Sequence, residues 1–252
     1  MACLYLVPNT LDHGTETVSL EAVLPREVIA RASKLTHWVA EDAKSARAFL
    51  KRVDAVAPLG RPIAQIQILE WPRAVKGGRG DAPIEVDPAM RRLIEPLLQG
   101  HDLGLISEAG LPAVADPGRE LVALAHQVGA QVVPLAGPSS LLLALSASGL
   151  NGQSFAFVGY LPQDASARAE RLRMLQARSV RERQTQIVIE TPYRNAVLLS
   201  ALLEHLSPDT RISVACGLSL PHGWCRTATA AQWKLGLPTF EKGWPAVFLF
   251  LA

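Results

Sequence analysis

The sequence predicts an α/β protein of two domains, with a mostly parallel sheet in the first domain and a mixed sheet in the second. Short apolar runs alternate with segments whose apolar residues recur at helical spacing, which indicates strands and helices in turn. The 252 residues exceed one typical domain, and a hydrophobic fraction of 49% can fill two cores. Proline and glycine are densest near residues 135–138, so we place the domains at 1–136 and 137–252.

Strands and helices alternate through the first domain. The apolar run at residues 3–7 predicts a buried strand, and a polar loop, residues 9–17, leaves its carboxyl end. The stretch at 63–69 alternates apolar residues with Gln65 and Gln67, which is typical of a half-exposed strand. The other expected strands are at 36–40, 101–106 and from 131 onward, and the expected helices are at 25–32, 43–53, 88–100 and 119–128.

The second domain continues the alternation and then departs from it. The segment at 223–228 follows a strand without an intervening helix, so we expect it to pair antiparallel and make the sheet mixed. The other expected strands are at 153–160, 185–190, 211–216 and 246–252, and the expected helices are at 140–149, 165–180 and 194–206.

Composition narrows the classes of protein. The formal net charge of +2 neither demands nor excludes nucleic acid as a partner. The three cysteines form no CxxC pair, which favours reduced thiols in a reducing compartment, and the six histidines lack metal-ligand spacing, so we expect no metal site. No apolar run approaches the roughly 20 residues that span a bilayer, and the N-terminus lacks the basic start of a signal peptide. We therefore expect a soluble, cytoplasmic protein.

The loop Ser107–Gly118 is the strongest candidate for a binding site. It reads SEAGLPAVADPG, and it leaves the end of a predicted buried strand and enters a predicted helix. Ligands of open α/β sheets bind in such loops, outside the carboxyl ends of the strands. The alternative is a tight connector whose two acids, Glu108 and Asp116, are solvated.

Four segments resemble, in order, the tetrapyrrole-methylase-like class of S-adenosylmethionine methyltransferases. The similarity is greatest to the branch that methylates a cytidine ribose 2′-hydroxyl in small-subunit ribosomal RNA. The segments are LYLVPN (4–9), VAEDAKSARAFL (39–50), the block from LISEAGLPAVADPG through VVPLAGPSSLLLALSASGL to FAFVGYLP (105–162), and IVIETPYR (187–194). Several spaced motifs in the right order rarely coincide by chance.

The resemblance implies S-adenosylmethionine as cofactor, a cofactor cleft between two α/β domains, and a homodimer. It implies that the central loop lines the methionine and ribose side of the cofactor, beside the start of the interdomain helix. The cofactor-binding residues that follow are Pro8, Ser107, Glu108, Ala109, Gly110, Leu111, Ala113, Val114, Ser139, Ser140, Thr191, Cys216 and Pro245.

Departures from the branch fall on the substrate side. The Pro-Ile-Gly-Asn-x-x-Asp pattern of the first loop is NTLDHGTET here, and the Arg-Glu-Leu-Thr-Lys segment is Cys216-Gly217-Leu218-Ser219-Leu220. The His-Asn-Glu segment after the second helix is missing, and the C-terminal helical extension of the branch does not follow the last strand. These changes keep methyl transfer as the leading hypothesis and leave ribosomal RNA as one candidate acceptor.

Acidic residues at strand ends are the candidates for a catalytic base, which a hydroxyl nucleophile requires. Glu190 ends a predicted strand and is our catalytic candidate, with a structural i, i+4 pair to Arg194 as the equal alternative. Glu41, Asp42 and Arg194 are the candidate substrate-binding residues. Asp116 is interpreted as a turn residue that caps the next helix.

Three further features of the sequence each have two interpretations. The arginines of the helix at 165–180 fit phosphate contact or, more commonly, a solvated face. Ser139 and Ser140 fit helix capping plus cofactor contact better than a serine nucleophile, since no histidine and acid stand at partner positions. The Gly-rich segment 76–81 lacks the ending of a phosphate loop and fits a connector, with a lid or RNA-contacting loop as the alternative.

The sequence thus predicts an S-adenosylmethionine-dependent methyltransferase, with 2′-O-ribose methylation of ribosomal RNA as its leading reaction. The alternatives are a methyltransferase acting on a small tetrapyrrole-like molecule and a non-catalytic, cofactor-binding regulatory descendant.

Overall fold

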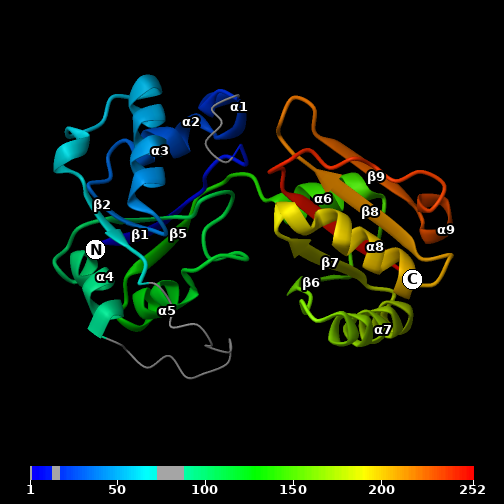
Figure 1. Cartoon of the computed structure of the whole chain (residues 1–252). Coiled ribbons are helices and arrows are strands. Elements are labelled where there is room, and N and C mark those ends of the chain that lie inside the picture. The colour runs from blue at the N-terminus through cyan, green and yellow to red at the C-terminus, as the bar shows by residue number, and fades with distance from the viewer. Residues whose placement is uncertain (1, 13–17, 73–87) are drawn as a thin grey trace. The chain divides into compact units, whose positions relative to one another are not determined.

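The computed structural model describes residues 2–12, 18–72 and 88–252, with residues 88 and 89 described by their backbone alone. The chain divides into two compact units, Met1–Pro138 and Ser139–Ala252. Each unit is built on a five-stranded sheet, so the predicted α/β class is confirmed (Figure 1).

The first unit is a three-layer α/β structure around a parallel sheet of order β3-β2-β4-β1-β5. Tyr5 and Val7 of β1 point to the core under α1, α2 and α3, whereas Leu4 points to the core under α4 and α5. The strands are β1 (Cys3–Val7), β2 (His37–Ala40), β3 (Gln67–Glu70), β4 (Leu103–Ile106) and β5 (Gln131–Pro134). The helices are α1 (Leu20–Val23), α2 (Arg26–Ala32), α3 (Ala43–Val56), α4 (Pro88–Leu98) and α5 (Arg119–Gln127).

One predicted strand of this unit is partly wrong. Residues Ile63–Gln65 form a 3-10 turn, and only Gln67–Glu70 forms the strand β3. Pro62, with ψ 139°, sets the chain into the turn, and Ile66 is the residue that the core buries. The apparent alternation therefore spans a turn and the start of an edge strand.

The second unit has the mixed sheet that the sequence predicts, in the order β6-β7-β10-β8-β9. Only β6 and β7 are parallel, and β9 pairs antiparallel with β8 as expected. The strands are β6 (Phe155–Tyr160), β7 (Thr185–Glu190), β8 (Arg211–Cys216), β9 (Trp224–Thr229) and β10 (Ala246–Leu251). The helices are α6 (Ser140–Ser148), α7 (Ala165–Glu182), α8 (Asn195–His205) and the unpredicted α9 (Ala230–Trp233).

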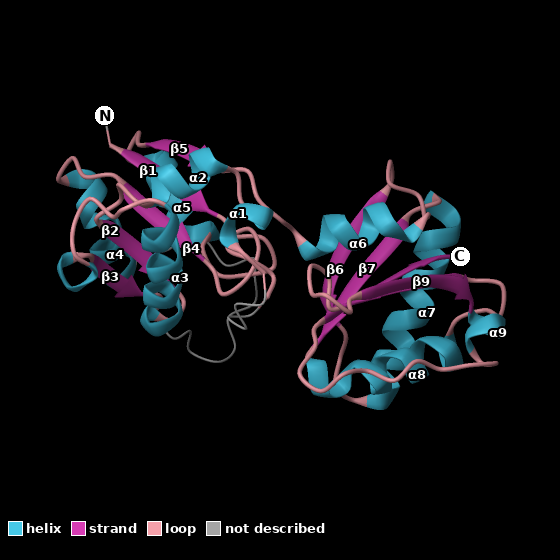
Figure 2. Cartoon of the chain, turned by 90° about the horizontal axis from the view of Figure 1, so that it is seen from above, coloured by secondary structure: helices cyan, strands magenta, loops and turns pink. Residues whose placement is uncertain are grey.

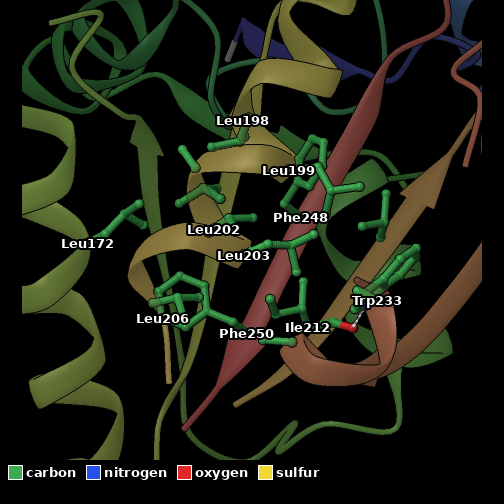
Figure 3. Close-up of a cluster of buried hydrophobic side chains, with 14 of the residues drawn as sticks. Leu172, Leu198, Leu199, Leu202, Leu203, Leu206, Ile212, Trp233, Phe248 and Phe250 are labelled. Carbon is green, nitrogen blue, oxygen red and sulfur yellow. Dashed lines mark hydrogen bonds between the residues drawn. The ribbon is translucent and has the colours of Figure 1, made fainter. Parts of the chain in front are cut away.

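Two apolar cores hold the second unit together. Helix α6 covers one face of the sheet, while α7 and α8 cover the other (Figure 2). The larger core packs leucines of α8 against Phe248 and Phe250 of the central strand (Figure 3). Trp233 is fully buried there and donates its indole N–H to the carbonyl of Ile212 at 2.9 Å, so its polar atom is satisfied.

A membrane-crossing helix was sought among the described residues, and none has the length and apolar character required.

Candidate functional site

The carboxyl ends of three neighbouring strands meet at one edge of the first sheet. Ile106 of β4 is level with Ala40 of β2 on one side and with Val7 of β1 on the other. The next residue of each chain segment is therefore Glu41, Ser107 or Pro8, all from predicted site segments. Strand order alone brings these three predicted site residues to one edge, although they are far apart in the sequence.

Asn9 ties the first loop to the central loop. Its backbone pairs with Gly110 in both directions, at 2.8 and 3.2 Å, and its Nδ2 donates to the carbonyls of Ser107 and Glu108. Gly110 takes φ +72°, which suits glycine, and a Cβ there would lie 3.3 Å from Leu11. Sequence reasoning missed Asn9, although a polar residue directly after a buried strand was an available signal.

The polar loop predicted after β1 is a loop over the residues that the structure describes, and its polar side chains are buried rather than solvated. Thr10 and Asp12 are buried, and the Asp12 side chain is only 1% exposed. Arg52 of α3 donates to both Asp12 oxygens, to Thr10 Oγ1 and to the carbonyl of Val18. Burial is possible because this guanidinium satisfies the carboxylate. Residues 13–17 lie outside the described residues.

Glu41 and Asp116 approach each other beside Ser107. Burial raises the pKa of Glu41 above its usual range, and repulsion by Glu108 adds to the shift. Burial, followed by repulsion from Glu41, raises the pKa of Asp116 to about 7. No cation contributes to either shift among the described residues. Within the part of the chain that the structure describes, this edge of the sheet therefore gathers acidic groups that no cation offsets.

The interpretation of Asp116 as a capping residue is wrong, and Asp42 has a capping role in addition to the substrate role predicted for it. Asp116 does not cap α5, because the N-cap residue is Gly118, which has no side chain, and burial places Asp116 near Glu41 instead. Asp42 is exposed and caps α3 through Ser45, whose backbone N–H donates at 2.7 Å, and this bond lowers the pKa of Asp42. The Ser45 hydroxyl also contacts Glu108 Oε2 at 3.2 Å. Asp42 is thus engaged in capping, which sequence reasoning did not assign to it.

Backbone shape distinguishes the rest of the central loop. Ala113 and Ala115 take φ +63° and +66°, a left-handed conformation that is uncommon without glycine. Strain of this kind persists only where surrounding structure enforces it, and it clusters at functional sites. Of the remaining predicted residues here, Ala109 and Leu111 are half-buried and Val114 is exposed.

The second sheet gathers its predicted residues in the same way. Ala246 of β10 is level with Glu190 of β7 and with Cys216 of β8, and Gly217 donates to the carbonyl of Pro245. Thr191, Cys216 and Pro245 are therefore at one edge. Cys216 is fully buried, and burial raises the pKa of its thiol to about 11, so it is not a thiolate at neutral pH.

Glu190 is engaged on both of its oxygens. Oε1 accepts from the backbone N–H of Thr191 at 2.8 Å and from its hydroxyl, and Oε2 accepts from Arg194 Nε at 3.1 Å. Of the two roles left open by the sequence, these contacts favour the structural pair. Arg194 donates to Glu190 in this pair.

Ser139 is the N-cap residue of α6 by position, but its side chain makes no capping hydrogen bond. The capping interpretation is therefore wrong for its hydroxyl. Ser139 is buried and Ser140 half-buried at the start of this helix. The Gly-rich segment 76–81 lies outside the described residues.

The first sheet edge has the features that a polar ligand requires. Ser107 is 4% exposed and its Oγ is fully buried, as is Glu41 Oε1, and neither atom has a hydrogen-bond partner among the described residues. Buried polar atoms are usually satisfied, so these two atoms at one strand edge are available to a bound polar group or to water. Gly110, which is buried and has a left-handed φ, stands in the same loop.

The fold is that of an α/β protein of two units, with a candidate binding site at the strand ends of the first sheet. Residues 42–232, more than half of the chain, match the family described as Tetrapyrrole (Corrin/Porphyrin) Methylases. The chain belongs to this family.

Curated proteins that are similar to this chain are also named as methyltransferases. The chain is 39% identical over 123 residues to Ribosomal RNA small subunit methyltransferase I of Vibrio cholerae, covering 49% of this chain and 41% of the relative. It is 40% identical over 138 residues to the protein of the same name in Mesorhizobium japonicum, covering 55% and 46%. The chain thus matches only about half the length of these relatives. The methyltransferase CobJ has the same fold at 16% identity, with a TM-score of 0.56 over 98% of this chain and 92% of that one.

Proposed function

We propose that this protein is an S-adenosylmethionine-dependent methyltransferase whose acceptor is a ribose 2′-hydroxyl of small-subunit ribosomal RNA. The single observation that carries the proposal is the edge of the first sheet, where two buried polar atoms in the segments around Gly110 have no hydrogen-bond partner among the described residues. Family membership and the names of the relatives support methyl transfer and the RNA acceptor.

The residues present fit this cofactor. A bound sulfonium supplies an activated methyl group, so the protein has to hold and align the reactants and exclude water. Ser107, Glu108, Ala109 and Gly110 offer backbone groups at the sheet edge, and Asn9 keeps their loop in place. Further binding residues are proposed after β1, further along the central loop and in the second unit: Pro8, Leu111, Ala113, Val114, Ser139, Ser140, Thr191, Cys216 and Pro245.

A substrate role is proposed for the exposed acid Asp42 and for Glu41 and Arg194. Glu190 remains the proposed catalytic base, because it is the last residue of β7 and lies at the strand ends of the second sheet. Its contact with Arg194 would have to open before it could accept a proton. We further propose a cytoplasmic homodimer, in keeping with the resemblance.

Cofactor binding is tested by calorimetric titration with S-adenosylmethionine. Gly110→Trp should weaken binding by at least about 100-fold, because an indole at this crowded position displaces the loop that holds the proposed site. Gly129→Trp is the matched control, because Gly129 has a similar φ of +74° but open space around its Cβ position. Both variants place a side chain at a positive φ, but only Gly110→Trp also crowds Leu11, so circular dichroism is used to check that both variants fold. An equal loss of binding in two folded variants, or no loss in Gly110→Trp, contradicts the proposed site.

The acceptor is tested separately with labelled cofactor. Incubation with small ribosomal subunits that lack the modification should transfer label to a ribose, whereas a panel of porphyrinogens should remain unlabelled. Label in a porphyrinogen and not in the RNA would show that the acceptor is a small tetrapyrrole.

A further inference from the structure

Three chain segments meet at the edge of the second sheet beside Pro245. Gly217, the first residue after β8, donates its backbone N–H to the carbonyl of Pro245, just before β10, at 3.0 Å. The start of α8 joins them, because Asn195 Nδ2 donates to the carbonyl of Trp244 at 2.9 Å. The loop in front of β10 is therefore held from two sides, next to a residue proposed to contact the cofactor.

The Trp244 indole lies against the open face of Gly217. Gly217 takes φ +61°, and a Cβ there would lie 2.4 Å from Trp244 Cε3. Gly223 packs against the same residue, since a Cβ at Gly223 would lie 2.1 Å from the carbonyl oxygen of Gly217. A side chain at either glycine would have to displace the ring or the backbone. Two glycines of the β8–β9 turn thus form a seat for one indole ring.

Asn195 carries an unused hydrogen-bonding atom at this place. Its side chain is 0% exposed, and its Oδ1 has no hydrogen-bond partner among the described residues. A buried amide with an unmet acceptor costs free energy that an apolar side chain would avoid. Local rules are broken in this way mainly at functional sites. The bond of Asn195 to Trp244 therefore indicates that the position of this loop matters to function.

The indole is held in place and yet left partly open. Trp38 and Trp233 are buried, and each donates its indole N–H to a backbone carbonyl. Trp244 is half-buried, and its indole N–H has no partner in the part of the chain that the structure describes. A flat ring that is fixed before a ligand arrives loses little conformational entropy on binding.

We propose that the Trp244 indole stacks on the nucleobase of the acceptor nucleotide, and that Asn195 and Gly217 are positioning residues that hold the ring. This inference rests on the proposed function and names the part of the acceptor that is recognised. Aromatic side chains stack on the unpaired bases of RNA, because every base has a flat face. The acceptor has to lie beside the cofactor for transfer, and Trp244 directly precedes Pro245. A ring that is open to solvent can receive one base of a long chain without enclosing the chain.

The experiment separates acceptor binding from cofactor binding. Transfer of label to small ribosomal subunits that lack the modification gives kcat and the KM for the subunits, and calorimetry gives the affinity for S-adenosylhomocysteine. Trp244→Leu should raise this KM by about 5- to 100-fold, as expected for one lost stack, and change kcat and cofactor affinity by less than about twofold. Trp244→Phe keeps a flat ring and should restore most of the loss.

Trp224→Leu is the matched control. Trp224 is also half-buried in the second unit, but its ring packs on Phe240, with centroids 6.0 Å apart, so its loss should leave the KM for the subunits unchanged. An equal rise in the two variants would show a general structural effect and overturn the proposal. Weaker binding of S-adenosylhomocysteine to Trp244→Leu would place the ring against the cofactor and would also overturn it.

Further variants test the seat of the ring. Gly217→Ala should reproduce the KM rise of Trp244→Leu, and the double variant should add nothing, since both remove the same stack. Gly243→Ala is the control, because Gly243 has φ +83° in the same loop but open space at its Cβ position. Asn195→Leu should act in the same direction as Gly217→Ala. With folding checked by circular dichroism, additive effects or an equal rise in Gly243→Ala would overturn the positioning roles.

The two hypotheses fail in different ways. If the unaltered protein transfers no label to the subunits, the RNA acceptor is rejected, and the stacking role with it. If the unaltered protein and Trp244→Leu transfer label with the same KM, only the stacking role is rejected.

Discussion

Both sheets carry acids near the ends of their strands, but only the acid in the second unit is paired with a cation among the described residues. In the second unit, Glu190 accepts three hydrogen bonds, and Arg194 neutralises it at 3.1 Å. In the first unit, Glu41 and Asp116 repel each other, and among the described residues their pKa values are raised without an opposing cation. An acid in the second unit therefore forms an internal ion pair, whereas the acids in the first unit form a candidate binding surface. The difference lies in whether the chain supplies the cation itself.

The largest effect should come from removing a cation that the chain does supply. Arg52→Met would leave Asp12 buried, with a side chain 1% exposed, and without its guanidinium. Removing one partner of a buried ion pair costs about 3–5 kcal/mol, because the remaining carboxylate loses its charged hydrogen-bond donor. Chemical denaturation measures the loss in the free energy of unfolding.

The matched control for this variant is Arg194→Met. Its partner Glu190 is also nearly buried but keeps both contacts with Thr191, so we expect a loss of only about 1 kcal/mol. Equal losses in the two variants would contradict the distinction drawn between the two pairs.

An intermediate effect of opposite sign should follow Asp116→Asn. The folded pKa of about 7 lies above the unfolded value of 3.8, so ionisation of Asp116 lowers stability as pH rises from about 4 to 7. Removing the charge should raise the free energy of unfolding at pH 8 by about 1–3 kcal/mol, after allowance for solvent screening. The gain should vanish near pH 4.

Denaturation of this variant at pH 8 and pH 4 is compared with that of Glu190→Gln. Loss of the charge on Glu190 weakens the contact with Arg194, so Glu190→Gln should lower stability at pH 8. A gain for Glu190→Gln, or a loss for Asp116→Asn, would reverse the comparison between the two edges.

The smallest effect should appear at the amino end of the first sheet. His37 stacks on His101 with ring centroids 4.6 Å apart, and burial, then repulsion by His101 and Arg61, lowers the pKa of His37. The unfolded state therefore binds more protons, and stability falls as pH drops through 6.5. We expect a loss of about 0.3–0.5 kcal/mol between pH 7.5 and 5.5.

Unfolding curves over this pH range for His37→Gln should lack that component. The contribution of His37 to the free energy of unfolding rises with pH, whereas that of Asp116 falls with pH. The double variant His37→Gln and Asp116→Asn should therefore lack both pH dependences. A His37→Gln protein with the full acid sensitivity would place its origin elsewhere.

Local patterns were sufficient for much of the fold. The apolar run before Ser107 and the helical spacing after Gly118 predicted β4, the central loop and α5, because strand and helix periodicity is a property of neighbouring residues. The antiparallel β9 was predicted from the missing helix before it. The short helices α1 and α9 were missed, because four residues carry too little periodicity to be recognised.

The candidate site was predicted in outline but not in its contacts. Ser107, Glu108 and Gly110 were predicted from one loop, whereas the bonds of Asn9 to that loop cross about a hundred residues of sequence. The Arg52–Asp12 pair spans 40 residues, and no local signal marks it. Such contacts depend on strand order, which is set by the packing of whole elements.

By itself, the sequence determined the class of fold, the family resemblance and the loops that carry the chemistry. These features depend on residue type, on local spacing and on short motifs. Only the tertiary structure decided which acids are compensated. Glu190 and Arg194 are four residues apart and meet within one turn, whereas Glu41 and Asp116 meet because β2 and β4 are neighbours in the sheet. Electrostatic state depends on distance and burial, and both are properties of the folded chain.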